Sequence, residues 1–137
     1  MDERDCSKLV MVVEDDRDVR DTLLEVLEDA EYQPLAATNG QDALDQLRAC
    51  DVKPCLILLD IMMPVMDGLQ FRAVQRQDPA LQEIPVVVLS AHASAQQMAK
   101  ELAVAEFLKK PVRLETLLAA VERYCGDEPF ASNPPTP

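Results

Sequence analysis

Histidine is scarce in this chain of 137 residues, and the single one is His92. The four cysteines, Cys6, Cys50, Cys55 and Cys125, show no Cys-x-x-Cys spacing. Structural zinc sites need four such ligands at characteristic spacings, so the sequence excludes a zinc site of the usual kind. We therefore expect the cysteines to be reduced thiols that are mostly buried.

Basic residues are also few, because 13 Lys and Arg stand against 25 Asp and Glu, which gives a formal net charge of -12. Such a chain repels nucleic acid and anionic membranes unless a local basic patch intervenes, and we find none in the sequence. We predict that the chain binds neither nucleic acid nor a membrane.

Long apolar runs are absent as well. The longest, such as residues 55–59 and 85–89, are far too short to span a bilayer. The chain begins Met-Asp-Glu-Arg-Asp, whose acidic charge is wrong for a signal peptide. We therefore expect a cytoplasmic location.

What the sequence does contain is typical of one folded domain. Hydrophobic residues make up 48% of the chain and charged residues 28%, a balance found in globular proteins. A chain of this length fits one compact domain better than two. We place the domain at residues 1–126. Residues 127–137 are too rich in proline to continue a helix, so we expect a flexible tail or a truncated linker, with no output domain in this chain.

Three short runs are continuously apolar and β-branched, which is typical of strands covered on both faces of a parallel sheet. These runs are Lys8 to Val13, Cys55 to Leu59 and Pro85 to Leu89. A weaker strand, Gln33 to Ala37, contains Pro34, which lacks a ladder donor and therefore belongs on a sheet edge. Glu106 to Lys109 supply a last short strand.

Helical periodicity lies between these strands. An apolar stripe predicts a first helix that starts near Asp16, and a similar stripe predicts a last helix between Pro111 and a C-terminal cap at Gly126. Further helices are expected from Gly40, over Gly68 to Gln77, and over Ser94 to Ala103. Five alternating β-α units predict an α/β fold built on a doubly wound parallel sheet.

Polar residues follow the predicted strands, and in open parallel sheets the ligand site lies beyond the carboxyl ends of the strands. They are Glu14-Asp15-Asp16, Asp60, Ser90 and Lys109-Lys110. Clustered carboxylates favour a hard cation, so Asp15 and Asp60 are candidate ligands of Mg²⁺. A carboxylate can accept a phosphoryl group, which makes Asp60 the candidate nucleophile and Lys110 its counter-charge. Ser90 could hydrogen-bond a phosphoryl oxygen.

Simpler roles are open to some of these residues. Asp60 could cap a helix, but the proline-containing loop after it leaves no helix to cap immediately. Asp16 is expected to be only the N-cap of the first helix. A calcium loop is excluded, because the glycine of its turn and its closing glutamate are missing. A phosphatase with an aspartyl nucleophile typically has Asp-x-Asp, whereas Ile61 and Met62 follow Asp60.

Four motifs together resemble the receiver domains of bacterial two-component response regulators. They are Val12-Val13-Glu14-Asp15-Asp16, Leu58-Leu59-Asp60-Ile61-Met62-Met63-Pro64-Val65-Met66-Asp67-Gly68, Val88-Leu89-Ser90-Ala91 and Phe107-Leu108-Lys109-Lys110-Pro111. The resemblance runs from about Lys8 to Cys125. It implies a flavodoxin-like fold in which five helices flank five parallel strands in the order 2-1-3-4-5, with the strand that contains Pro34 at an edge.

The resemblance also implies a role for each residue at the strand ends. Glu14 and Asp15 are the acidic pair of the Mg²⁺ site, the backbone carbonyl of Met62 completes it, Asp60 is phosphorylated, Lys110 and Ser90 stabilise the phosphoryl group, and Ser90 and Phe107 are the switch residues. A plain strand-end hydroxyl and an ordinary core aromatic stay open as alternatives for Ser90 and Phe107. Met62 and His92 occupy variable positions at the mouth of the site, and our hypothesis is that they set the phosphoryl lifetime.

The sequence departs from the family pattern at three positions. Ala103 stands where relatives often have glycine, which puts the turn there in doubt because glycine alone adopts positive φ cheaply. Arg72 and Gln75 stand where relatives tend to be apolar, so the family pattern does not predict which face of the third helix docks. A partner surface or a shifted helix would account for them.

The predicted function is a phosphoacceptor switch that catalyses only its own phosphorylation and dephosphorylation. A sensor histidine kinase or a histidine phosphotransfer protein is the expected donor to Asp60. The fourth helix, fifth strand and fifth helix are the expected surface for a downstream protein. A homodimer is left open. The alternative is a phosphorylation-independent receiver-like binding module, which the loss of an acidic ligand, Asp60 or Lys110 would signal; none is lost.

Overall fold

The computed structural model of the chain describes residues 9–50, 53–60, 68–91, 94–101 and 103–125. Five β-α units follow one another along the chain. The elements are β1 (Leu9–Val13), α1 (Arg17–Asp29), β2 (Gln33–Ala37), α2 (Gly40–Ala49), β3 (Leu56–Asp60), α3 (Gly68–Gln77), β4 (Val86–Ser90), α4 (Ser94–Glu101), β5 (Glu106–Lys109) and α5 (Leu114–Cys125). None of the described helices combines the length and apolar character needed to cross a bilayer.

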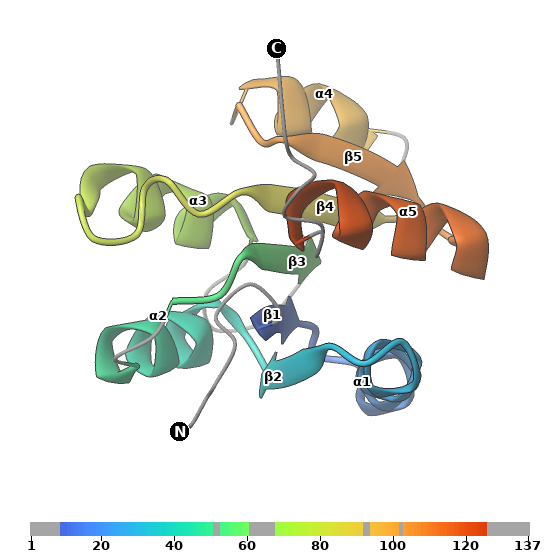
Figure 1. Cartoon of the computed structure of the whole chain (residues 1–137). Coiled ribbons are helices and arrows are strands. Elements are labelled where there is room, and N and C mark those ends of the chain that lie inside the picture. The colour runs from blue at the N-terminus through green and yellow to red at the C-terminus, as the bar shows by residue number, and fades with distance from the viewer. Residues whose placement is uncertain (1–8, 51–52, 61–67, 92–93, 102, 126–137) are drawn as a thin grey trace, which may run out of the picture.

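The strands form one parallel sheet in the order β2-β1-β3-β4-β5, as predicted. Figure 1 shows α1 and α5 on one side of the sheet and α2 and α3 on the other. Successive strand residues point to opposite faces, so β1 sends Met11 and Val13 into the α2–α3 side and Val10 and Val12 into the α1–α5 side. Burial on both faces explains why β1 is apolar throughout and why β3 and β4 are apolar up to their last residue.

Local signals fix several element boundaries. Asp16 is the N-cap of α1, as expected, because its Oδ1 accepts hydrogen bonds from the backbone nitrogens of Asp18 at 3.0 Å and Val19 at 3.1 Å. Pro34 lies on edge strand β2, which confirms that prediction. The predicted cap Gly126 and the tail 127–137 lie outside the described residues.

The expectation of reduced thiols is wrong for one pair of cysteines. Cys55 and Cys125 form a disulfide, although 70 residues separate them in the sequence. The last residue of α5 lies beside the residue that precedes β3, and their Cα atoms are 5.5 Å apart. Cys50 is a free thiol, and Cys6 lies outside the described residues. The spacing of cysteines along the sequence could not predict this disulfide, because the tertiary fold brings the two residues together.

Ala103, in the turn between α4 and β5, has a φ of 55°. An alanine therefore adopts the left-handed conformation that glycine favours. The Arg72 guanidinium donates a hydrogen bond from Nη2 to the Ala103 carbonyl at 2.8 Å. The Ala103 nitrogen donates to the Lys100 carbonyl at 3.2 Å. Hydrogen bonds on both sides of the residue therefore hold a conformation that a Cβ atom disfavours.

Replacement of Ala103 by glycine is expected to raise the free energy of unfolding by about 1 kcal/mol, because glycine removes the steric cost of positive φ. Urea denaturation measures the change. The matched control is Ala105→Gly, at an exposed position with no positive φ, where the added freedom of the unfolded chain should lower stability. Equal destabilisation by both substitutions would contradict the strain at Ala103.

Arg72 and Gln75, the two residues of α3 that depart from the family pattern, point inward. Gln75 is fully buried and donates from Nε2 to the carbonyls of Leu81 at 2.9 Å and Ile84 at 3.0 Å. Its Oε1 accepts a hydrogen bond from Arg72 Nη1 at 2.8 Å. Burial, with the nearby charge of Arg76, lowers the pKa of Arg72. Neither a partner surface nor a shifted helix is needed, because both side chains find hydrogen-bond acceptors within the domain and Gln75 satisfies two buried carbonyls.

Gln75→Leu is expected to lower the free energy of unfolding by about 2–3 kcal/mol. The leucine would remove the Nε2 donor of the Ile84 carbonyl, one of the two hydrogen bonds that the Leu81 carbonyl accepts, and one acceptor of Arg72. Gln77→Leu, on an exposed position of the same helix, should change stability by less than about 0.5 kcal/mol. Thermal or urea unfolding of both variants tests the network, and equal stability of Gln75→Leu and the wild type would refute it.

Candidate functional site

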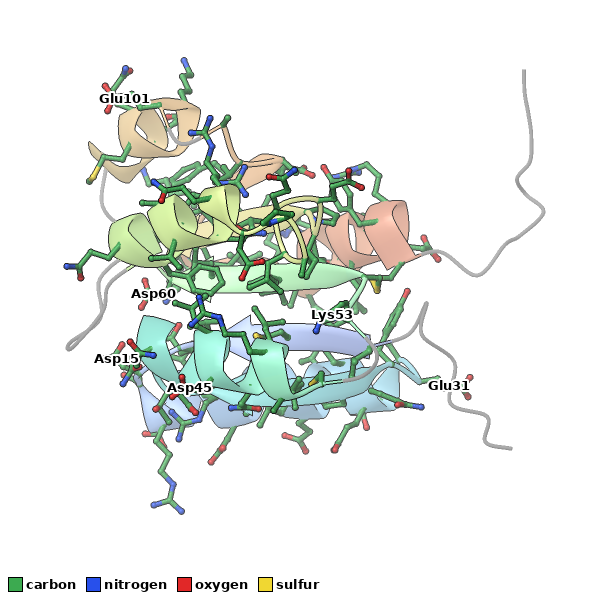
Figure 2. All side chains as sticks on the ribbon, turned by 90° about the vertical axis from the view of Figure 1, so that its left-hand side faces the viewer. Asp15, Glu31, Asp45, Lys53, Asp60 and Glu101 are labelled. Carbon is green, nitrogen blue, oxygen red and sulfur yellow. A yellow bond between two sulfur atoms is a disulfide. The ribbon has the colours of Figure 1, made fainter. Side chains whose placement is uncertain are left out.

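The fold brings the predicted site residues to one end of the sheet. Glu14 and Asp15 follow β1, Asp60 is the last residue of β3, and Ser90 is the last residue of β4. Lys110 follows β5 directly, and its backbone nitrogen donates to the Ser90 carbonyl at 2.9 Å. Figure 2 shows Asp15 and Asp60 at one end of the sheet and Lys53, before β3, at the other. The carboxyl ends of four parallel strands therefore form the candidate site.

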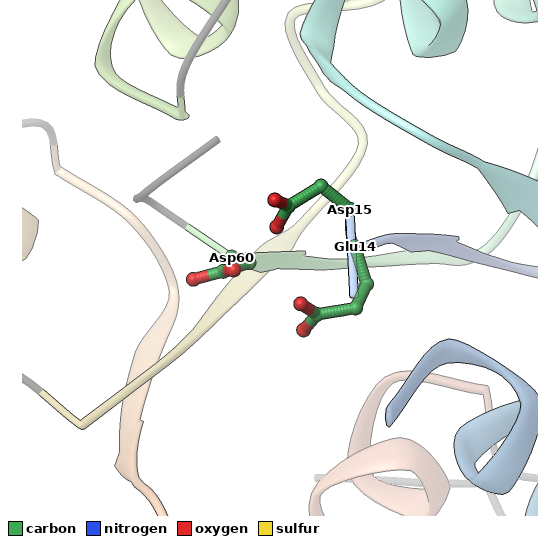
Figure 3. Close-up of side chains that lie close together, drawn as sticks. All are labelled: Glu14, Asp15 and Asp60. Atoms are coloured by element: carbon green, nitrogen blue, oxygen red, sulfur yellow. The ribbon is translucent and has the colours of Figure 1, made fainter. Parts of the chain in front are cut away.

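Three carboxylates of this site converge. Glu14, Asp15 and Asp60 each offer an oxygen, and these oxygens lie within 4.8 Å of one another. Figure 3 shows the three side chains directed into one shared space. Glu14 and Asp60 are buried, with 2% and 8% of their surface exposed, whereas Asp15 is exposed. Buried carboxylates at this spacing repel one another, and an all-oxygen set that is open on one side fits a hard dication such as Mg²⁺.

Lys110 supplies positive charge to the cluster. Its Nζ lies 3.0 Å from Glu14 Oε1, in an ion pair between a half-buried ammonium and a buried carboxylate. The pairing joins residues 96 positions apart, so it depends on the sheet and not on local sequence. Among the described residues, one ammonium lies against three carboxylates, and this excess of negative charge again favours a bound cation.

Arg20 is a site residue that the sequence did not reveal. Its Nη1 donates to the Glu14 carbonyl at 2.9 Å and reaches the Asp15 carbonyl at 3.5 Å. The Asp16 nitrogen donates to Glu14 Oε2 at 3.3 Å. These bonds fix the backbone that carries the two acids. The sequence signal for Arg20 is its position one turn into α1 after the acidic run, which does not distinguish it from other helix-surface arginines.

Ser90 and Phe107 lie on adjacent strands. Ser90 pairs with Lys109 and Val88 with Phe107, so Ser90 and Phe107 are diagonal neighbours on one face of the sheet. Ser90 is buried, with 1% of its surface exposed. Phe107 is half-buried and packs against the hydrophobic cluster on the α2–α3 side. The structure places both residues where the site meets the α4–β5 region. Met62 and His92 lie outside the described residues.

An apolar groove of about 630 Å³ runs between α1 and the start of α5 and ends beside the site. Its lining includes Lys110 of the site, and Val19 and Leu23 line its α1 wall. Leu114, which is 53% exposed, lines the α5 wall. The groove therefore places an apolar surface next to the charged site.

Comparison with known proteins decides the family. The sequence model described as the response regulator receiver domain matches residues 10–122, which is most of the chain. This chain belongs to that family. Receiver domains are the phosphoacceptor modules of two-component signal transduction, and they generally bind Mg²⁺ at an acidic cluster. The predicted family and fold are thereby confirmed.

Individual relatives agree with the family. The receiver domain is 29% identical over 122 residues to the polar-differentiation response regulator DivK of Brucella anthropi, covering 88% of this chain and 98% of DivK. It is 33% identical over 117 residues to the protein PilG of Pseudomonas aeruginosa, covering 84% and 85% of the two chains. The solved structure of the chemotaxis protein CheY4 of Vibrio cholerae superposes with a TM-score of 0.76 at 28% identity, covering 85% of this chain and 97% of CheY4.

Proposed function

We propose that this receiver domain switches by accepting a phosphoryl group on Asp60. The observation that carries the proposal is the convergence of Glu14, Asp15 and Asp60 within 4.8 Å, with Lys110 paired to Glu14 at 3.0 Å. The cluster lies at the strand ends, where doubly wound sheets bind their ligands. It contains a nucleophile, a cation site and a fixed counter-charge, the groups that phosphoryl transfer requires.

The reaction would form a bond between an Asp60 carboxylate oxygen and phosphorus while the bond from phosphorus to the donor nitrogen breaks. The donor would be the phosphohistidine of a sensor kinase or a histidine phosphotransfer protein. Glu14, Asp15 and Asp60, with the Met62 carbonyl, would hold Mg²⁺, which would neutralise charge on the phosphoryl oxygens. The Lys110 ammonium, which now pairs with Glu14, would also bind a phosphoryl oxygen, since Glu14 would then face the Mg²⁺ ion.

Phosphorylation would be read through Ser90 and Phe107. A phosphoryl oxygen on Asp60 would accept a hydrogen bond from the Ser90 hydroxyl, because β3 and β4 are adjacent and Asp60 pairs with Leu89, beside Ser90. Movement of Ser90 would alter the packing of its diagonal neighbour Phe107. The surface formed by α4, β5 and α5 would then change its affinity for a downstream protein. The influence of Met62 and His92 on phosphoryl lifetime stays a prediction from the sequence.

The partners and location follow from the same proposal. A kinase or phosphotransfer protein would deliver its phosphohistidine beside Lys110, where the apolar groove with exposed Leu114 offers a docking surface. We propose a cytoplasmic location, because the donor and the switch act on the same side of the membrane. Residues 1–126 would form the receiver unit. The domain would catalyse only its own phosphorylation and dephosphorylation.

The proposal is tested by incubating the chain with acetyl phosphate and Mg²⁺ and measuring its intact mass. The wild type should gain one phosphoryl group, and Asp60→Asn should gain none, because an amide oxygen is too weak a nucleophile to form the acyl phosphate. The gain should also vanish when Mg²⁺ is chelated. A wild type that gains nothing under these conditions would instead support a phosphorylation-independent binding module.

A further inference from the structure

Cys55 and Cys125 lie far from the acidic cluster, at the opposite end of the sheet. Cys55 precedes β3 and Asp60 ends it, so the strand separates them by about 16 Å at 3.3 Å per residue. Figure 2 shows Lys53, two residues before Cys55, at the end of the sheet away from Asp15 and Asp60. The proposed phosphoryl chemistry uses neither cysteine.

The fold itself holds the two cysteines together. Their Cα atoms are 5.5 Å apart, within the range that a disulfide requires. Cys125 has 1% of its surface exposed and belongs to the same hydrophobic cluster as Leu56 and Val121. Leu56 follows Cys55 on β3, and Val121 precedes Cys125 on α5. The packing of α5 on the sheet therefore places the two sulfurs next to each other, whether or not they are bonded.

The reduced state also has a satisfied geometry. Cys55 Sγ lies 3.2 Å from the Leu9 carbonyl oxygen, close enough for a thiol to donate a hydrogen bond. Cys55 is half-buried, which leaves it accessible to a small oxidant, whereas Cys125 is enclosed. The pair therefore combines an accessible thiol with a buried partner that can resolve its oxidation product.

We propose that Cys55 and Cys125 are a reversible redox site that a peroxide closes. The Cys55 thiolate attacks a peroxide oxygen, the O–O bond breaks, and Cys55 becomes a sulfenic acid as the peroxide is reduced to water. The Cys125 sulfur then attacks the Cys55 sulfur, the S–O bond breaks, and a second water leaves. A dithiol reductant reverses the link through a mixed disulfide.

Reversibility follows from the compartment proposed above. Thiols in the cytoplasm are kept reduced, and disulfides found there are usually transient and redox-sensing. Closing the link ties the last residue of α5 to the start of β3 across 70 residues of chain. Oxidation would therefore fix the C-terminal end of a helix that belongs to the proposed output surface, independently of phosphorylation on Asp60.

The test begins with fully reduced wild-type chain, treated with hydrogen peroxide and then alkylated. Peptide mapping without reduction should show Cys55 linked to Cys125 and Cys50 alkylated, and a dithiol should reverse the link. The oxidised chain should unfold roughly 10 °C higher than the reduced chain, because the cross-link constrains the unfolded state.

Cys50→Ser is the matched control, since Cys50 is a free and comparably exposed thiol. It should link and gain stability as the wild type does. Cys55→Ala and Cys125→Ala should each abolish both effects, and two variants guard against a folding defect in one. The proposal is overturned if Cys55 and Cys125 remain alkylated after peroxide, if they oxidise separately to sulfonic acids, or if either pairs with Cys50 instead.

Discussion

Lys110→Ala is expected to slow phosphorylation by saturating acetyl phosphate and Mg²⁺ by about 100-fold, the loss typical when one preorganised charge at a reacting oxygen is removed. Lys110 contributes its ammonium to the acidic cluster, where Nζ lies 3.0 Å from Glu14 Oε1. Without this ammonium, the carboxylates repel the negatively charged oxygens of the transferring phosphoryl group more strongly. The rate is measured by intact mass against time.

Lys109→Ala is the matched control for this prediction. Lys109 neighbours Lys110 in the sequence, but its side chain is exposed, and the charge of the chain changes equally in both variants. Its phosphorylation rate should stay within about twofold of the wild type, because a solvated charge outside the cluster is screened. Lys110→Arg should recover only part of the rate, since guanidinium keeps the charge but not the compact geometry of ammonium. Equal rates in the two alanine variants would contradict the role of Lys110.

Asp15→Asn is expected to weaken Mg²⁺ binding by at least about 100-fold. Loss of a residue that only hydrogen-bonds a metal ligand already lowers metal affinity by about 10- to 100-fold. The asparagine keeps an oxygen but removes a full negative charge from a site in which one oxygen of each of three carboxylates lies within 4.8 Å of the others. The same change relieves repulsion in the metal-free chain, so the variant should unfold at a higher temperature than the wild type without Mg²⁺. Calorimetric titration gives the affinity.

Asp16→Asn controls for the loss of one acid at the start of α1. Asp16 caps the helix through Oδ1, and asparagine caps a helix equally well. This variant should bind Mg²⁺ with the wild-type affinity and gain no stability in its absence. If Asp15→Asn and Asp16→Asn have the same affinity, then general surface charge, and not the cluster, holds the cation.

The fold could be predicted because burial on both faces leaves a strong sequence signal. Strands β1, β3 and β4 have no polar residue before their last position, and short runs of this kind, bounded by polar residues, are typical of central strands in a parallel sheet. The site followed from the fold, since the ends of parallel strands meet at one edge and the sequence placed Asp60 and Ser90 there. Strands β3 and β4 begin and end one residue later than predicted, so Asp60 and Ser90 each end a strand instead of following it.

The interactions that the sequence did not reveal depend on which particular atoms the fold brings together, at short as well as long separation along the chain. The Cys55–Cys125 disulfide joins residues 70 positions apart. Gln75 is polar at a position that the helical period assigns to the core, and the carbonyls of the following turn, which it satisfies, account for it. Arg20 is one charged residue among many on α1 until the fold places the Glu14 carbonyl beside it. Periodicity reports which face a residue occupies, not which atoms it meets there.

The central claim is that Asp60, among several clustered acids, carries the phosphoryl group, and chemical mapping tests it most directly. The chain is phosphorylated with acetyl phosphate and Mg²⁺, reduced with borohydride to convert the acyl phosphate into an alcohol, digested and sequenced by mass spectrometry. We predict homoserine at position 60 and unmodified acids at Glu14 and Asp15. Conversion of Glu14 or Asp15 with Asp60 intact, or no converted residue in a chain that had gained a phosphoryl group, would contradict the account.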